Sequence, residues 1–337
     1  MPAQSLIAPA PPGYEPVSAR VLTDIAILPC DVFIWRGPRP VLYANRGADL
    51  SKLVARSLRG ISLLVHEADA DLLREALAES LPRVLSSQDV CPGERGKTAY
   101  SIAAKVLVPL FERSRSLGRE GLTLTHKVVD AITSSMLGDE EIMWAMVGAA
   151  PKRLAAHTHA INTAVYGIVL AKASGIGNAE AVRDLARGGL LHDIGKNRVA
   201  PGIVDKAGPL DEAEWQAMQG HVKAGYEMVV KASGHVPSYA HIIAEHHERA
   251  DGSGYPAGRG GSGIAVDSQL VGIADAFDAL TCKRVYRDGV SAFEALRLMR
   301  VAMHGQFSDD LLRSFIKLLG GWQAAADLGG SSRPAVQ

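Results

Sequence analysis

The spacing of apolar residues predicts a few strands near the start of the chain and helices over most of the remainder. Four apolar runs, rich in β-branched and aromatic residues and bounded by turn residues, predict strands at 21–27, 31–35, 41–44 and 61–66. Segment 47–60 has capping residues at its start and Gly60 at its end, and segment 67–85 repeats leucine at helical spacing. These elements together predict a small α+β domain.

The pattern downstream is helical. Segments 98–115 and 120–149 predict helices, and the chain from Pro151 onward is helix-rich, with long loops that contain Gly and Pro. The fold class is therefore mainly α, an all-helical C-terminal bundle preceded by the small α+β domain and a helical connector. The predicted parts are a flexible leader at 1–16, the α+β domain at 17–86, the connector at 87–150, the bundle at 151–320 and a flexible tail at 321–337.

Composition narrows the class of protein. Of 337 residues, 47% are apolar, and 36 basic residues balance 36 acidic ones, so no global field would attract a nucleic acid polymer. The three cysteines lie far apart, which argues against a disulfide scaffold or a thiolate zinc site. Neither a signal peptide nor an 18-residue apolar segment is present, so we expect no membrane span and a cytoplasmic location.

Nine of the eleven histidines follow residue 150. One of them lies in the segment GGLLHDIGK at 188–196, which is the first candidate for a chemical site. Its apolar residues predict a buried helix that ends near Gly195. A buried carboxylate at Asp193 is costly unless a cation neutralises it, and a carboxylate beside His192 can bridge two metal ions. Lys196 follows on the same helical face, where an ammonium suits a phosphate oxygen.

Further histidines and carboxylates extend this pattern. His246 and His247 in the helical segment IIAEHHE diverge by about 100°, so we expect each to serve a different metal. His221 lies on an amphipathic helix, and Asp275 and Asp278 share one face of an apolar helix. A set of histidines and carboxylates without thiolates favours Fe, Mn or Zn over Mg or Ca.

These motifs resemble those of the HD-GYP family, a branch of the HD phosphohydrolase superfamily associated with hydrolysis of cyclic di-GMP. They occur in family order across 151–320: HDIGK at 192–196, APGIVDKAGPLDEAEW at 200–215, GHVKAGYEM at 220–228, HHERADGSGYP at 246–256 and DAFDALTCKRVYR at 275–287. The resemblance implies two divalent metal ions, Fe or Mn first and Zn, Ni or Co as further possibilities.

The resemblance also implies a role for particular residues. The implied metal ligands are His159, His192, Asp193, His221, His246, His247 and Asp275. His159 is chosen over His157 because THAINTAVYG matches the family pattern there. The implied catalytic residues are Asp193 and Lys196. The implied substrate-binding residues are Tyr255, Asp278, Arg284 and Arg287, with Asp278 either contacting the substrate or supporting a ligand.

The expected reaction is hydrolysis of cyclic di-GMP to linear pGpG by a hydroxide that bridges two metals. Some family members hold a third metal with a glutamate four residues before the first histidine, where this chain has Ala155. We therefore expect two metals, and slow or absent conversion to GMP. A signalling-protein partner or self-association through the α+β domain is also expected.

Three alternatives remain open at this point. The first is a cyclic di-GMP-binding or partner-docking module without turnover, and the second is hydrolysis of another cyclic or linear nucleotide. The third is a di-iron oxygenase of the HD type, although the phosphate-directed cations speak against that reaction.

Overall fold

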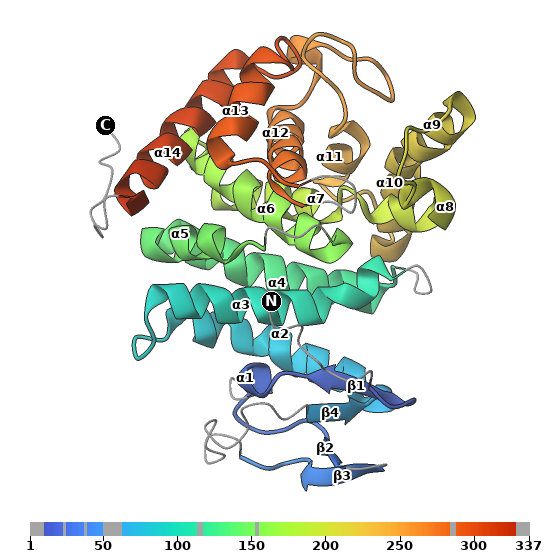
Figure 1. The fold of residues 1–337 in the computed structure, drawn as a ribbon, viewed down its shortest axis with the longest axis vertical. Coiled ribbons are helices and arrows are strands. Elements are labelled where there is room, and N and C mark those ends of the chain that lie inside the picture. Colours follow the sequence, from blue (N-terminus) through green and yellow to red (C-terminus); the bar gives the residue numbers. More distant parts are fainter. Residues whose placement is uncertain are drawn as a thin grey trace. The chain divides into compact units, whose positions relative to one another are not determined.

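A computed structural model describes residues 10–22, 25–36, 39–49, 63–112, 117–151, 155–283 and 288–327, with side chains up to residue 320 (Figure 1). The chain divides into two compact units, Met1–Val106 and Leu107–Gln337. The boundary falls at the end of helix α3 (Pro92–Leu107), so it lies inside the predicted connector. The limits predicted for the leader, domains and tail stay predictions.

The first unit contains an antiparallel sheet with the strand order β1-β4-β2-β3. Its elements are β1 (Tyr14–Val17), α1 (Ala19–Leu22), β2 (Val32–Arg36), β3 (Arg39–Ala44), β4 (Leu63–His66), the 3₁₀ helix η3 (Glu67–Asp69), α2 (Ala70–Ser86) and α3. Glu15 of β1 accepts hydrogen bonds from Arg74 of α2 and Lys105 of α3, at 2.6 and 2.8 Å. These ion pairs tie the edge strand to both helices.

The strand predicted at 21–27 is wrong. Its adjacent residues Val21 and Leu22 are both buried, and two neighbours cannot face the same side of a strand, so the chain forms α1 there instead. The first strand comes earlier, at β1, where Tyr14–Val17 pair with Leu63–His66. The predicted helix at 47–60 lies mostly outside the described residues. The other three strands and the helix at 67–85 are confirmed.

The second unit is helical among its described residues. Its helices are α4 (Arg119–Gly138), α5 (Glu140–Ala149), α6 (Ala156–Ala173), α7 (Ala179–Leu191), α8 (Pro201–Val204), α9 (Glu212–Gln219), α10 (His221–Ser233), α11 (Ala240–Glu245), α12 (Val266–Thr281), α13 (Ala292–Val301) and α14 (Asp309–Asp327), with 3₁₀ helices η4 (Val108–Phe111), η5 (Ile194–Arg198) and η6 (Gly261–Gly263). The predicted mainly α fold class is confirmed. Helix α14 runs past Gly320, where a flexible tail was predicted.

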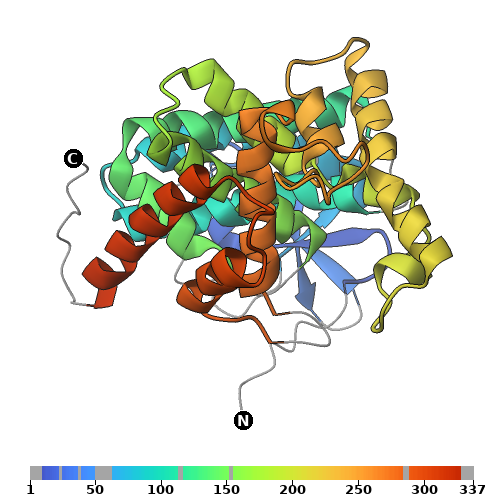
Figure 2. The ribbon, with the colours of Figure 1, turned by 90° about the horizontal axis from the view of Figure 1, so that it is seen from above.

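Helix α6 forms the centre of this unit. It carries a single charged residue, Lys172, near its end, and every residue from His159 to Ala171 is buried. A helix that is buried on all its faces must be surrounded by other elements. Helices α7 and α12 pack against it, while α8 and α9 lie at the margin of the unit in two perpendicular views (Figures 1 and 2).

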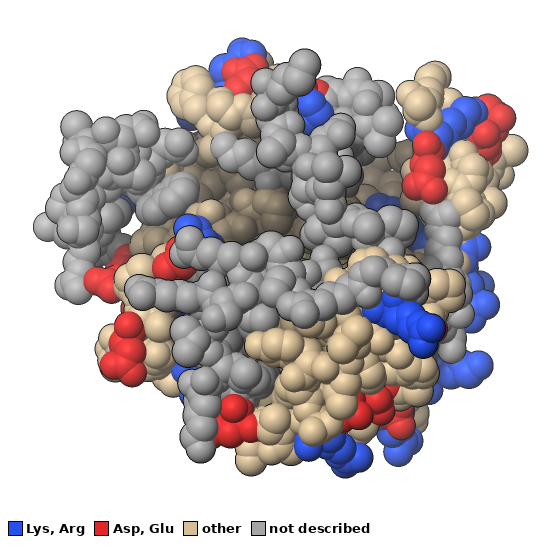
Figure 3. Space-filling view, turned by 60° about the horizontal axis from the view of Figure 1, so that its bottom comes forward, with Lys and Arg blue, Asp and Glu red and all other residues tan. Residues whose placement is uncertain are grey.

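The described helices include none that is long and apolar enough to cross a bilayer. On the face shown in Figure 3, acidic and basic side chains both occur among the described residues, in keeping with the balanced composition.

Candidate metal centre

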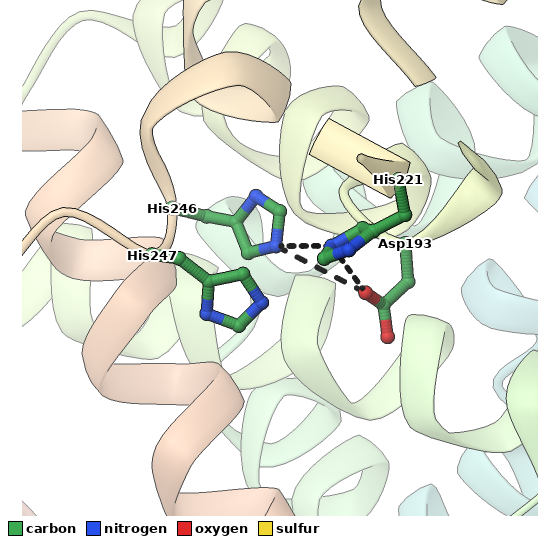
Figure 4. Close-up of side chains that lie close together, drawn as sticks. All are labelled: Asp193, His221, His246 and His247. Atoms are coloured by element: carbon green, nitrogen blue, oxygen red, sulfur yellow. Dashed lines mark hydrogen bonds and ion pairs between the residues drawn. The ribbon is translucent and has the colours of Figure 1, made fainter. Parts of the chain in front are cut away.

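Seven buried or half-buried side chains form two groups. Within each group, the potential ligand atoms all lie within 4.8 Å of one another. One group consists of Asp193, His221, His246 and His247 (Figure 4). The other consists of His159, His192 and Asp275. All seven residues predicted as metal ligands are thus brought together from five separate segments of the second unit. The alternative histidine, His157, is in neither group found among the described residues.

The segment carrying His192 and Asp193 departs from the predicted helix. Helix α7 ends at Leu191, and η5 follows instead of a continuous helix to Gly195. Gly195 lies directly against α10, since a Cβ atom there would be 1.9 Å from the carbonyl oxygen of His221. Only glycine permits this approach. The close packing of η5 on α10 places Asp193 beside His221.

Three histidines are oriented by the backbone of their own segments. The Nδ1 atoms of His192, His221 and His246 donate to the carbonyl oxygens three residues earlier, at 2.7, 2.6 and 3.0 Å. Each Nε2 atom is thereby left as an acceptor that faces the centre of the site. A histidine whose Nδ1 is bonded in this way is prepared to bind a metal through Nε2.

Asp193 belongs to the first group and also faces two histidines of the second. Its Oδ1 atom is 3.4 Å from Nε2 of His221, and its Oδ2 atom is 3.4 Å from Nε2 of His192 and 3.7 Å from Nε2 of His159. Burial raises the pKa of this carboxyl, but Lys196 and the surrounding imidazoles lower it well below its ordinary value. Asp193 is therefore a carboxylate, with one oxygen directed toward each group.

His159 lies between two carboxylates. Its Nε2 atom is 3.1 Å from Oδ1 of Asp275, and its Nδ1 atom is 2.7 Å from Oδ2 of Asp278. Burial lowers the pKa of His159, but its hydrogen bonds to these two carboxylates outweigh burial and raise that pKa to about 10. The second group therefore requires a positive charge at its centre, which either a proton or a metal ion provides.

Asp278 supports His159 from behind. It is 1% exposed, and its other carboxylate oxygen accepts a hydrogen bond of 2.7 Å from Asn162. Of the two roles considered for Asp278, this position favours support of a ligand over contact with substrate. Asn162 escaped the sequence analysis, although its place three residues after His159 was a usable signal.

His246 and His247 belong to the same group, contrary to the expectation that they would serve different metals. That expectation assumed a continuous helix, but α11 ends at Glu245. The pair therefore lies in a turn, and its rings approach within 4.1 Å between centroids. Burial lowers the pKa of both histidines, that of His247 to about 3, so both are neutral imidazoles.

The donor set fits divalent metal ions. Among the described side chains, Nε2 of His192 and Oδ1 of Asp193 are buried acceptors without a hydrogen-bond partner. In addition, Nε2 of His221 and Nε2 of His246 face each other at 3.4 Å, although both are acceptors once their Nδ1 atoms donate elsewhere. Buried acceptors that converge without donors are stabilised by a cation. Nitrogen and oxygen donors suit Fe, Mn or Zn.

The helical second unit matches a known protein family. Residues 146–310 match the family model of the HD domain. The chain contains an HD domain. The resemblance to the HD-GYP family is also confirmed, and it applies to the helical second unit.

Relatives and a solved structure agree with this assignment. A 3'3'-cGAMP-specific phosphodiesterase of Vibrio cholerae is 37% identical over 161 residues, 48% of this chain and 35% of that protein. A cyclic di-GMP phosphodiesterase of Pseudomonas aeruginosa is 27% identical over 277 residues, 82% of this chain and 64% of that protein. The chain thus spans less than two thirds of either relative. An HDGYP protein from Bdellovibrio bacteriovorus matches in fold, with a TM-score of 0.66 and 17% identity over 91% of this chain and 100% of that one.

Lys196, predicted as a catalytic residue, and Tyr255, predicted to bind substrate, both lie beside the histidines and aspartates of the site. Lys196 pairs with Asp193 and keeps about a third of its side chain exposed. Tyr255 packs its ring on His247, with 4.6 Å between centroids and 30° between planes. Burial raises the pKa of Tyr255, so it is a neutral phenol. Arg284 and Arg287 lie outside the described residues.

The loop that carries Tyr255 is held by a residue that the sequence analysis passed over. Glu248 is 5% exposed, and its two carboxylate oxygens accept 2.8 Å hydrogen bonds from the backbone of Ala257 and Arg259. Gly254 lies so close to this segment that a Cβ atom would be 2.4 Å from the carbonyl oxygen of His247. An acid placed directly after two site histidines was the available signal for Glu248.

Proposed function

We propose that this HD domain is a metal-dependent phosphodiesterase that hydrolyses cyclic di-GMP to linear pGpG. The observation that carries the proposal is the pair of ligand groups that face the two oxygens of Asp193. Two metal ions held on either side of one carboxylate are typical of enzymes that hydrolyse phosphate esters. The relatives named as phosphodiesterases of cyclic dinucleotides support the same class of reaction.

The proposed ligands are His159, His192 and Asp275 for one ion and His221, His246 and His247 for the other, with Asp193 shared. Bound ions of this kind supply a water molecule that ionises near neutral pH, and they neutralise the charge of a phosphodiester. The chain's own part is to hold the ligands rigidly. Backbone carbonyls orient three imidazoles, and Asp278 orients His159.

Other residues contact the substrate in this proposal. Lys196 presents a partly exposed ammonium beside Asp193, where it binds a non-bridging phosphate oxygen and stabilises charge that develops there. Tyr255 is a neutral hydrogen-bond donor and an apolar surface next to His247. Arg284 and Arg287 complete the set of phosphate-binding cations.

The proposed end product follows from Ala155. This residue occupies the N-cap position of α6, four residues before His159, and its methyl group cannot bind a metal. A third ion that would act on the linear product therefore lacks a ligand at that position. We expect pGpG to accumulate and conversion to GMP to be slow.

A second candidate substrate is 3'3'-cGAMP. The relative that is 37% identical to this chain over 161 residues is named as specific for that dinucleotide. Both substrates present the same phosphodiester to the metal ions and differ in one base. The difference between them therefore concerns the part of the site that binds bases.

The test is hydrolysis by protein loaded anaerobically with Fe²⁺ or Mn²⁺, with cyclic di-GMP and 3'3'-cGAMP as separate substrates and chromatography of the products over time. We expect pGpG as the main early product, and no hydrolysis by the His192→Ala, Asp193→Ala double variant. Hydrolysis by that variant at the parent's rate would contradict the proposed site. GMP as the dominant early product would contradict the role given to Ala155.

A further inference from the structure

Trp215 is a half-exposed tryptophan on helix α9, a helix that buries none of its residues in the core. It is 46% exposed, and within α9, all of which the structure describes, no residue is buried. Helix α9 therefore does not use Trp215 to anchor itself in the core. An exposed aromatic ring of this size, in a position where a polar residue would be stable, is typical of a surface that binds a ligand or another molecule.

A row of aromatic rings connects Trp215 to the metal centre. The ring of Trp215 lies 5.8 Å from that of Tyr255 at an interplanar angle of 78°, and Tyr255 lies 4.6 Å from His247. The rings of Trp215 and Tyr255 are thus nearly perpendicular. They form the two walls of an aromatic corner. Two ring contacts thus connect the proposed ligand His247 to the exposed Trp215.

Both walls of this corner are held in place by polar contacts. At the start of α9, the backbone of Glu214 donates to Asp211 and the backbone of Asp211 donates to Glu214, each at 2.8 Å. Lys206 forms an ion pair with Glu214 and links α9 to the end of α8. Glu248 holds the other wall through the loop of Tyr255. The corner is therefore built before any ligand arrives, which lowers the entropy cost of binding.

We propose that Trp215 is a specificity-determining residue, the stacking surface for a purine base of the dinucleotide whose phosphodiester lies at the metal centre. The inference rests on the proposed function and adds to it the residue that selects the base. A base stacked flat on Trp215 presents its edge to Tyr255, whose phenol can donate a hydrogen bond to it. Stacking of this kind strengthens binding without taking part in bond cleavage.

The variants Trp215→Ala and Trp215→Phe test the inference, with Gln216→Ala as the control on the same helix. Loss of the stacking surface should raise KM for cyclic di-GMP about tenfold in Trp215→Ala and change kcat by no more than about twofold. The preference for cyclic di-GMP over cyclic di-UMP should fall about tenfold, because a purine has the larger surface to stack. Trp215→Phe should lie between the parent and Trp215→Ala, and Gln216→Ala should match the parent.

A binding measurement separates this inference from the proposed function. Cyclic di-GMP added to the metal-free protein should quench tryptophan fluorescence in the parent, and the quenched component should be absent in Trp215→Phe. If the metal-loaded parent cleaves no cyclic dinucleotide, the proposed function fails and this quenching alone decides the inference. If the parent cleaves cyclic di-GMP and Trp215→Ala keeps the parent's KM, the inference fails while the function stands.

A merely structural role for Trp215 predicts a different set of results. If Trp215 only covered Tyr255, Trp215→Ala would lower Tm and would weaken cyclic di-GMP and cyclic di-UMP equally. That result would overturn the inference. Because Trp215 is exposed and α9 is held by polar contacts, we expect the Tm of all three variants to equal that of the parent.

Discussion

His159 illustrates how individual residues prepare this site. It is buried on a helix of almost uncharged residues, yet both of its ring nitrogens meet carboxylates. Asp278 accepts from Nδ1, which directs Nε2 toward Asp275 and Asp193. Asn162 donates to the second oxygen of Asp278 and prevents that carboxylate from turning. The orientation of one proposed ligand thus depends on two residues that bind no metal.

The first prediction concerns Asp278 at this scale. Asp278→Ala removes the buried carboxylate that accepts from Nδ1 of His159 and from the amide of Asn162, so we expect about 10- to 100-fold weaker metal binding and a loss of about 1–3 kcal/mol in unfolding free energy. Metal titration against a chelator and urea denaturation measure the two effects. Asp278→Asn is the matched control, because its amide oxygen still accepts from His159, and it should lose less. Unchanged metal affinity in Asp278→Ala would contradict the supporting role.

At the scale of elements, four of the seven proposed ligands lie directly after the end of a helix. Helix α7 ends at Leu191, just before His192 and Asp193, and α11 ends at Glu245, just before His246 and His247. Adjacent residues inside a helix point in directions about 100° apart. After a helix end, the backbone can turn both side chains toward one point. The two tandem pairs therefore reach a common centre that continuous helices would deny them.

The second prediction concerns α11, which His241 ties to α12. Nδ1 of His241 faces the carbonyl oxygen of Ser238 at 2.7 Å, and Nε2 faces both carboxylate oxygens of Asp267 at 2.9 Å. The hydrogen bond to Asp267 raises the pKa of His241 above its ordinary value despite partial burial, and the charge of Glu245 acts in the same direction. The doubly protonated ring is therefore favoured in the folded protein.

The sign of the pH dependence follows from this direction. The pair contributes its full stability below the unfolded pKa of about 6.5, and the contribution is lost as pH rises through the higher folded pKa. The difference in urea midpoint between the parent and His241→Asn should be largest near pH 6 and shrink toward about pH 9. A difference that grows with pH would contradict the assignment. A Lys223→Ala variant, which alters an exposed ion pair with Glu227, should show no such trend.

At the scale of the whole molecule, charge is balanced overall and concentrated locally. The sequence carries equal numbers of acidic and basic residues, whereas the site gathers two carboxylates and five imidazoles in the interior of the second unit. Such a cluster is stable when a cation occupies it. The stability of this unit should therefore depend on metal, and the stability of the first unit should not.

The third prediction follows from that difference. Removal of metal with a chelator should lower the Tm of the second unit, and Mn²⁺ at about 100 times its Kd should restore about 2.7 kcal/mol of stability. Differential scanning calorimetry measures the shift, and the His192→Ala, Asp193→Ala variant serves as the control that should not respond. A transition that is the same with and without metal in the parent would show that the cluster does not need a cation.

The family and most of the site were predictable from residue types and their spacing. The HD pair, the tandem histidines and the aspartate at position 275 are marked by polar residues inside apolar runs, where burial is costly without compensation. The mainly α fold class followed from helical periodicity over the second half of the chain. The first strand was missed because β1 precedes the apolar run that suggested a strand.

The sequence by itself determined which side chains have to be compensated, because that depends on residue type and local burial alone. It did not determine how they are divided into groups, since the ends of α7 and α11 depend on the packing of η5 against α10 and of α11 against its neighbours. Only the tertiary structure placed Asp278 behind His159 and Trp215 beside Tyr255. Those pairs are far apart in the chain, and no local pattern records a contact that two distant segments make.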